Sequence, residues 1–157
     1  MPVRSAGILL YRRSAGALEL LLVHPGGPYW ARKDDGAWSI PKGEHADGED
    51  PLDCARREFE EETGTAPPVG ALVALGEVRQ RSGKRVSAWA AEGDLDADAV
   101  RSNTFTVEWP PRSGRMQEFP EVDRAGWFTL DAARAKILAA QTPFLDRLVS
   151  LRGQTPQ

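Results

Sequence analysis

The segment over residues 43–65, GEHADGEDPLDCARREFEEETGT, most constrains the fold because it encodes a helix with a defined start and stop. Asp50 is a favourable N-cap, and Pro51 suits the first helical position because a backbone N–H there would have no helical partner. Gly64 supplies the left-handed residue that commonly follows a helix. Together these residues predict a helix over 51–63.

The predicted helix has an apolar face and an acidic face. At about 100° per residue, four residues gather on the side that we assign to the core: Leu52, Ala55, Phe59 and Thr63. Three carboxylates gather about a quarter-turn away: Glu58, Glu61 and Glu62. Because neighbouring carboxylates repel one another, a hard divalent cation such as Mg²⁺ or Mn²⁺ would stabilise this stripe. The alternative is a solvated acidic face that forms ion pairs with arginines.

The same segment resembles the Nudix box, G-x5-E-x7-R-E-U-x-E-E-x-G-U, where U is a bulky apolar residue. Gly43 stands at the first glycine and Glu49 at the isolated glutamate. The later positions match in the same order, as Arg57-Glu58, Phe59, Glu61-Glu62 and Gly64. The one departure is Thr65, where an aliphatic residue is expected, and it concerns packing after the helix rather than the chemistry.

The resemblance implies an α/β (α+β) fold, the Nudix-type α/β/α sandwich with a mixed central sheet. The residues themselves predict six strands, at 5–12, 18–24, 72–80, 85–92, 105–109 and 124–128. The first two strands form a hairpin in the middle of a covered sheet, because both are nearly continuous in apolar residues. The next two form a second hairpin, turned at Ser82-Gly83.

Two loops and two further helices complete the expected chain. Loops are expected at 25–37 and 110–120, where proline and glycine are frequent. A helix is expected at 131–140, and another begins after the break at Gln141-Thr142-Pro143. We expect one Nudix domain over residues 1–152 and a flexible tail at 153–157.

The composition is that of an ordinary globular protein, with 41% hydrophobic and 27% charged residues. A net charge of −3 argues against binding to a nucleic acid polymer, which requires a basic surface. The chain contains no run of 18 apolar residues, so no membrane span is expected. The single cysteine, Cys54, excludes an internal disulfide and fits a reducing compartment. We therefore expect a cytoplasmic protein.

The resemblance also implies the chemistry. A metal site would be formed by three carboxylates and one backbone carbonyl, those of Glu58, Glu61, Glu62 and Gly43. With Mg²⁺ or Mn²⁺ as cofactor, the protein would hydrolyse a nucleoside diphosphate linked to another group X, because metal ions neutralise phosphate charge and activate water. Glu58 and Glu61 are accordingly catalytic candidates. Arg57 would orient Glu58 or Glu49 through a charge-assisted hydrogen bond, the alternative being a surface ion pair of little energetic value.

Members of the family also recruit a glutamate outside the box as a metal ligand or base. Three candidates are present in the second half of the chain: Glu108, Glu118 and Glu121. Glu121 is favoured because PEVDRAGWF resembles a similarly placed segment in the diadenosine tetraphosphate hydrolases of the family. The alternative for each is a solvated loop carboxylate.

Three residues are candidates for binding the substrate. Lys42 lies in the run WSIPKG, which resembles the dinucleoside polyphosphate and diphosphoinositol branch of the family, and its charge could contact a phosphate. Arg79 belongs to a basic hairpin that could bind further phosphates or be a solvated tip, together with Arg81, Lys84 and Arg85. Trp109 could stack on a base or pack internally, and the same two roles are open to Tyr29 and Trp30.

The expected partner is a small nucleotide or diphosphate substrate, and a homodimer is possible. The run WSIPKG favours nucleoside triphosphates or dinucleoside polyphosphates over ADP-ribose or diphosphoinositol polyphosphates. A non-catalytic Nudix-fold nucleotide-binding module is the main alternative, although a binder has no need of the acidic cluster. The related isopentenyl diphosphate isomerase is disfavoured because it needs a catalytic cysteine in a loop or strand, whereas Cys54 lies in the predicted helix.

Overall fold

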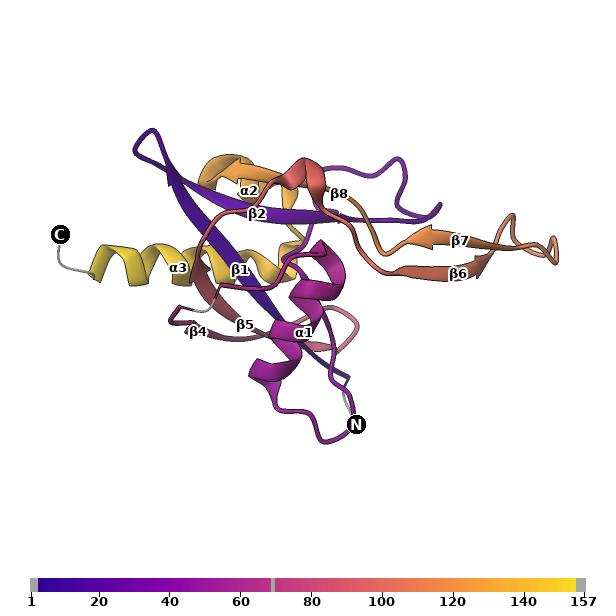
Figure 1. Cartoon of the computed structure of the whole chain (residues 1–157), viewed down its shortest axis with the longest axis horizontal. Helices are drawn as coiled ribbons and strands as arrows, with labels where there is room; N and C mark the ends of the chain where they lie inside the picture. Colours follow the sequence, from indigo (N-terminus) through magenta and orange to yellow (C-terminus); the bar gives the residue numbers. More distant parts are fainter. Residues whose placement is uncertain (1–2, 69, 155–157) are drawn as a thin grey trace.

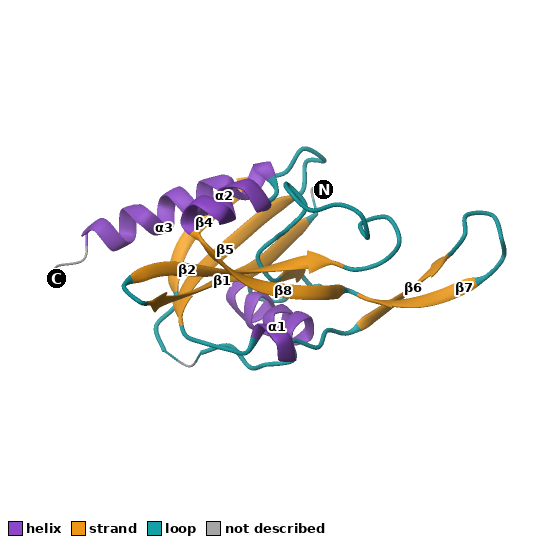
Figure 2. Ribbon diagram, turned by 90° about the horizontal axis from the view of Figure 1, so that it is seen from above, coloured by secondary structure: helices purple, strands orange, loops and turns teal. Residues whose placement is uncertain are grey.

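A mixed β-sheet runs through the middle of the molecule, with one helix on one face and two helices on the other (Figure 1, Figure 2). The computed structural model describes residues 3–68 and 70–154. The strand order is β4-β5-β1-β2-β8, and β3 pairs with β1 beside this path. The strands span Arg4–Ser14 (β1), Ala17–Pro25 (β2), Lys42–Glu44 (β3), Val73–Arg79 (β4), Arg85–Glu92 (β5) and Val122–Thr129 (β8). Among the described strands of this sheet, β1 and β5 pair in parallel and the other pairs are antiparallel, so the expected mixed sheet is confirmed.

The β1–β2 hairpin lies in the centre of the sheet, as its apolar sequence predicts. Successive residues of β1 enter opposite layers because side chains alternate along a strand. Ile8 and Leu10 pack with Phe59 beneath the sheet. Leu9 packs with Phe144 on the other face. The expected α/β/α sandwich is therefore confirmed.

Helix α1, Pro51–Thr63, has the predicted bounds and caps. The Asp50 carboxylate accepts hydrogen bonds from the backbone N–H groups of Leu52, at 3.1 Å, and Asp53, at 3.2 Å. Gly64 adopts a left-handed φ of 77°, and its N–H donates to the Glu60 carbonyl at 2.8 Å. The predicted core face needs one correction, because Leu52 is only half-buried while Cys54 is fully buried.

Helices α2, Leu130–Lys136, and α3, Thr142–Gln154, cover the opposite face (Figure 2). The prediction of a helix over 131–140 was too long: Ile137 adopts a ψ of 148°, and the backbone then pairs with Trp38. A short 3-10 turn, Ala139–Gln141, precedes α3. Helix α3 continues two residues into the predicted tail, and the rest of that tail lies outside the described residues. No described helix is long and apolar enough to cross a membrane.

Two strands form a separate sheet that projects from the body of the molecule (Figure 1). Strand β6, Thr104–Glu108, follows a 3-10 turn at Ala97–Ala99 and agrees with the predicted strand. The expected loop over 110–120 is wrong in its second half, because Met116–Pro120 forms β7 and pairs with β6. This ribbon is solvated rather than half-buried, with Met116 63% exposed, so β7 lacks the buried alternation that would have predicted it.

Candidate active site

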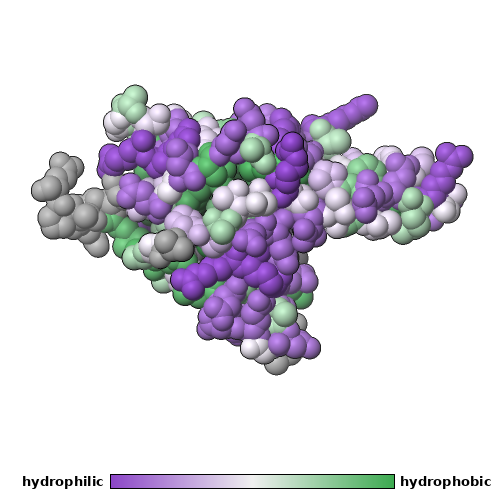
Figure 3. Space-filling model, viewed as in Figure 1, coloured by the Kyte–Doolittle hydropathy of each residue, from purple (hydrophilic) through white to green (hydrophobic). Residues whose placement is uncertain are grey.

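The acidic face of α1 lies against β3, and strongly hydrophilic residues gather over this region of the surface (Figure 3). Glu58 is buried, and its carboxylate rests directly on the backbone of Gly43. A Cβ added to Gly43 would lie 2.0 Å from the Glu58 carboxyl carbon and from Oε2. The first glycine of the box is therefore needed here to make room for the first glutamate of the helix.

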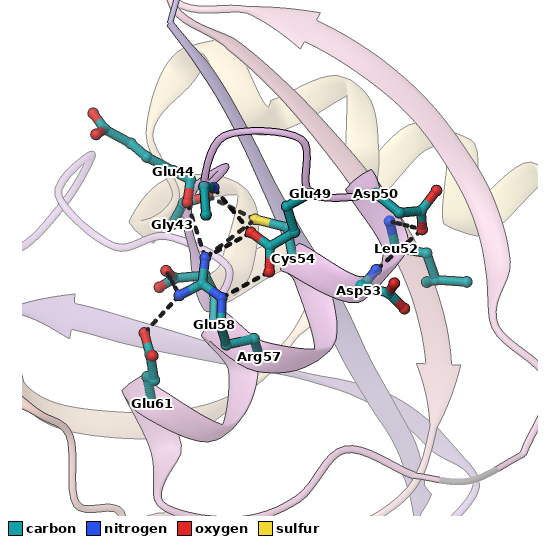
Figure 4. A network of polar contacts seen from close by, with 11 residues as sticks. Gly43, Glu44, Glu49, Asp50, Leu52, Asp53, Cys54, Arg57, Glu58 and Glu61 are labelled. Carbon is teal, nitrogen blue, oxygen red and sulfur yellow. Dashed lines mark hydrogen bonds and ion pairs between the residues drawn. The ribbon is translucent and has the colours of Figure 1, made fainter.

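Arg57 occupies the centre of the acidic network (Figure 4). Its Nε and Nη2 donate to the two carboxylate oxygens of Glu49 at 2.8 and 2.9 Å. Its Nη1 donates to Glu58 Oε1 at 2.7 Å and to Glu61 Oε2 at 3.1 Å. The predicted contacts of Arg57 with Glu49 and Glu58 are both present. The forked pairing is a strong charge-assisted geometry, and it lowers the pKa of the Glu49 carboxyl to about 2.

Glu62 of α1 lies next to Lys42, the first residue of β3. The backbone N–H of Lys42 donates to Glu62 Oε1 at 3.1 Å. Burial raises the pKa of the Glu62 carboxyl, against the opposing effect of the Lys42 charge. Burial lowers the pKa of the Lys42 ammonium, and the charge of Lys84 lowers it further. The Glu62 carboxyl and the ammonium groups of Lys42 and Lys84 therefore lie in the same poorly hydrated part of the site.

Glu121 is the one of the three outside glutamates that reaches this site. It lines a cavity of about 520 Å³ together with Glu58 and Glu62. Burial raises its pKa, and the charge of Glu61 raises it further. Glu108 instead accepts hydrogen bonds from backbone N–H groups inside the projecting hairpin, and Glu118 is exposed on β7.

The cavity has an aromatic side and a basic side. The described lining residues that are not acidic are Pro25, Gly26, Gly27, Tyr29, Trp30, Lys42, Gly43, Lys84 and Phe105. Phe105 is an aromatic lining residue that the sequence analysis did not identify. Its ring packs on Gly27, where an added Cβ would lie 2.7 Å from Phe105 Cζ. No local pattern in the sequence links these two positions, because β6 and the loop after β2 meet only in the folded chain.

Two predicted substrate residues are set back from this cavity. Trp109 packs edge-on against Tyr29, with ring centroids 5.2 Å apart, and Tyr29 is the member of this pair that lines the cavity. Of the basic hairpin, the described lining includes Lys84 and not Arg79, which lies at the end of β4. The structure therefore brings the hairpin to the site through a different residue from the one predicted.

His24 fixes the loop that carries the aromatic side. The imidazole is fully buried, with Nδ1 2.7 Å from Asp123 Oδ1 and Nε2 2.6 Å from the Lys33 carbonyl oxygen. It also packs edge-on against Trp38. These contacts join the end of β2, the loop after it and the start of β8, so the loop is held in place beside the site.

The donors at this site suit a hard divalent cation. Within the described residues, no three carboxylate, histidine or cysteine groups are already gathered at metal-ligand spacing. Arg57 binds one oxygen each of Glu58 and Glu61, and in the described part of the chain no hydrogen bond occupies the second oxygen of either. Burial raises the pKa of the Glu58 carboxyl, and the charge of Glu61 raises it further, so these two carboxylates are close enough to repel one another. A surplus of negative charge on oxygen donors fits Mg²⁺ or Mn²⁺.

The comparisons with known proteins agree with this geometry. A family model described as the NUDIX domain matches residues 1–148. The chain belongs to the Nudix family. Its fold and its place among the Nudix hydrolases, which are pyrophosphohydrolases, are as expected from the box.

Solved structures of Nudix proteins superpose on almost the whole chain. A binary complex of the Caenorhabditis elegans Ap4A hydrolase matches with a TM-score of 0.69 and 22% identity, covering 96% of this chain and 99% of that one. The NUDIX domain of Shewanella oneidensis NrtR, complexed with ADP ribose, matches at 0.66 and 17%, covering 97% and 89%. A mutT/nudix protein from Listeria innocua matches at 0.64 and 18%, covering 98% and 96%. No curated protein sequence gives a significant match.

Proposed function

We propose that this Nudix protein hydrolyses a nucleoside diphosphate linked to another group X, with Mg²⁺ or Mn²⁺ as cofactor. The observation that carries the proposal is the convergence on one cavity of Glu58 and Glu62 of α1, the Gly43 backbone and Glu121, with Lys42 beside them. A solvated acidic face would not need a glycine to make room for one of its carboxylates. It would also not bury Glu58.

The metal would be held by three carboxylates and one backbone carbonyl, those of Glu58, Glu61, Glu62 and Gly43. When bound, it supplies charge neutralisation for the diphosphate and lowers the pKa of a water molecule. Arg57 keeps Glu58 and Glu61 oriented through its Nη1 contacts while Glu49 fixes the other side of the guanidinium. These contacts preorganise the acidic face before substrate arrives.

Glu121 is suited to the role of general base. It comes from outside the helix and lines the same cavity as Glu58. Its raised pKa makes the carboxylate a better proton acceptor than an exposed glutamate. Lys42 would contact a phosphate oxygen with its ammonium, and Trp109 would support the aromatic side through Tyr29.

Nucleoside triphosphates and dinucleoside polyphosphates are the favoured substrates. The similarity of this chain to an Ap4A hydrolase supports that choice, and the run WSIPKG points the same way. ADP-ribose is the alternative, which the similarity to a NUDIX domain complexed with ADP ribose supports. Cys54 is buried in α1, and burial raises the pKa of its thiol to about 11, which is unfavourable for an isomerase that needs a reactive cysteine.

The test is a turnover screen across nucleoside triphosphates, diadenosine polyphosphates, ADP-ribose and diphosphoinositol polyphosphates, with Mg²⁺ or Mn²⁺. Glu61→Gln should lower kcat/KM by about 10²-fold or more, because loss of a residue that only orients a metal ligand already costs about 10- to 100-fold. Glu60→Gln is the matched control, since Glu60 is an exposed carboxylate of the same helix outside the acidic stripe. No turnover on any substrate, with nucleotide binding unchanged in Glu61→Gln, would instead support the binding module.

A further inference from the structure

The projecting β6–β7 ribbon has two long edges, and its register decides which residues lie on them (Figure 1). In an antiparallel ribbon, pairs that exchange hydrogen bonds alternate with pairs whose backbone N–H and C=O groups point outward. The Trp109 N–H donates to the Arg115 carbonyl at 2.9 Å, and the Glu121 N–H donates to the Asn103 carbonyl at 2.8 Å. Every second pair from these is bonded. The outward backbone groups therefore belong to the pairs Thr104–Pro120, Thr106–Glu118 and Glu108–Met116.

The β7 edge of the ribbon and the β4 edge of the main sheet are both protected against a further strand. On β7, Pro120 has no N–H to donate, and Glu118 would face the same charge if two copies paired there. On β4, Arg147 of α3 donates from Nη1 to the carbonyl oxygens of Leu75 and Glu77, at 2.9 and 3.1 Å. Each of these edges therefore carries a feature that prevents strand pairing.

The β6 edge carries no proline or lysine that would protect it in this way. Its sequence, TFTVE, consists largely of β-branched and aromatic residues, which favour strands. Within residues 3–68 and 70–154, no hydrogen bond from outside the ribbon reaches the outward backbone groups of Thr104, Thr106 or Glu108. A two-stranded ribbon is only marginally stable by itself, and an edge of this kind is a template for another strand.

The partner that this edge fits is a second copy of the chain, because β6 matches itself in antiparallel register. With a two-fold axis at Thr106, this residue faces the partner's Thr106, and Thr104 faces the partner's Glu108. These pairs would bond through their outward backbone groups. Between them, Phe105 faces the partner's Val107. Threonine pairs and pairs of an aromatic with a β-branched residue are both favourable directly across antiparallel strands.

The ends of two ribbons paired in this way are complementary in charge. Antiparallel pairing brings the tip of each ribbon towards the segment that precedes β6 in the other copy. The tip carries Arg112 and Arg115, which are both exposed. In the segment before β6, the Asn103 N–H donates to the Glu61 carbonyl at 2.9 Å, next to the exposed Glu60 of α1. The basic tip would therefore approach the acidic C-terminal half of the α1 helix in the other copy.

We propose that two copies of this chain associate through β6 and join their ribbons into one continuous antiparallel sheet, with a two-fold axis at Thr106. The interface would place the partner's Val107 beside Phe105, which lines the active-site cavity. Each copy thereby supports the aromatic side of the other copy's site. This inference is independent of the proposed function, because the mass of the protein in solution measures it rather than turnover.

The first test measures self-association of the full chain by analytical ultracentrifugation over a range of protein concentrations. Wild type should form a reversible dimer. Thr106→Pro removes one outward N–H from each copy and leaves the hydrogen bonds within the ribbon intact. Its dissociation constant should rise about 10-fold or more, as expected for the loss of one hydrogen bond from each copy. Glu118→Pro is the matched control, because Glu118 lies directly opposite Thr106 and its N–H points outward from the other edge. This control should dimerise like wild type.

The second test examines the register with charges at Thr106, which is exposed in a single copy. In Thr106→Lys or Thr106→Glu alone, like charges would lie directly opposite each other and should weaken the dimer about 3-fold or more. A mixture of the two variants should associate more tightly than either alone, because opposite charges then face each other. This rescue is specific to an interface in which Thr106 faces the partner's Thr106.

Four results would overturn the proposal. Wild type could be monomeric at every concentration, or it could form a dimer that Thr106→Pro leaves unchanged. Equal weakening by Thr106→Pro and Glu118→Pro would show that the ribbon itself, rather than its β6 edge, was disturbed. A mixture of the lysine and glutamate variants that associates no better than each variant alone would show that Thr106 does not face itself.

Discussion

Gly43→Ala offers a sharp separation between catalysis and folding. The new Cβ would lie 2.0 Å from the Glu58 carboxyl carbon, whereas ordinary contact begins at 3.4 Å, so the carboxylate must move by about 1.4 Å. Because that carboxylate ends a flexible side chain, it can rotate away without displacing backbone. A shift of 1 Å in a catalytic group costs about 10²-fold in rate, equivalent to about 2.7 kcal/mol. We therefore expect kcat/KM to fall about 10²-fold.

The fold should tolerate the same change. The φ of Gly43 is not in the left-handed region, so alanine is not strained there, and Arg57 keeps its contacts with Glu49 and Glu61 when the Glu58 carboxylate moves. The assay pairs steady-state kinetics with chemical denaturation of the variant. Gly70→Ala is the control, because a Cβ at this position would have no atom within 4 Å and the φ of Gly70 is not in the left-handed region. Activity of Gly43→Ala within about 3-fold of wild type would refute the reasoning. So would a loss of stability as large as the loss of activity.

Three other predictions test the site and its support. Arg57→Lys should keep the charge but lose the forked contact with Glu49, lowering kcat about 10- to 100-fold with little effect on stability, as measured by kinetics and thermal unfolding. Metal-free protein should lose stability as the pH rises above 4.5, because the raised pKa values of Glu58 and Glu62 favour their protonated forms in the folded state. Mg²⁺ should therefore raise Tm more at pH 8 than at pH 5.5, and an equal or smaller rise at pH 8 would contradict this. Phe59→Ala should cost about 3–5 kcal/mol in urea denaturation, since Phe59 is fully buried under the sheet, and a cost below 1 kcal/mol would contradict its core assignment.

The parts of the molecule that were predicted correctly are those specified by neighbouring residues. Helix α1 runs from Pro51 to Thr63 because Asp50 and Gly64 cap its two ends, and both caps are satisfied within one turn of the helix itself. The β1–β2 hairpin follows from two apolar runs around a short polar turn. The contact between Arg57 and Glu49 could be predicted because the box spacing defines both positions.

The parts that were predicted wrongly depend on contacts between distant segments. Residue Ile137 leaves the helix because its backbone neighbours pair with Trp38, about a hundred positions earlier, in place of a further helical turn. Strand β7 forms by pairing with β6 in a solvated ribbon, which leaves no buried alternation in the sequence. Lys84 rather than Arg79 lines the cavity because Lys84 leads into β5, which pairs with β1 next to β3, whereas Arg79 ends the outer strand β4.

The central claim is that the carboxylates of α1 bind a divalent cation for hydrolysis of a diphosphate. The most direct test is to measure Mn²⁺ affinity by titration followed by electron paramagnetic resonance. The three proteins to compare are wild type, Glu61→Gln and the exposed-site control Glu60→Gln. We predict Mn²⁺ affinity in Glu60→Gln close to that of wild type and a loss of about 10-fold or more in Glu61→Gln. Equal Mn²⁺ affinity in all three proteins would contradict the account.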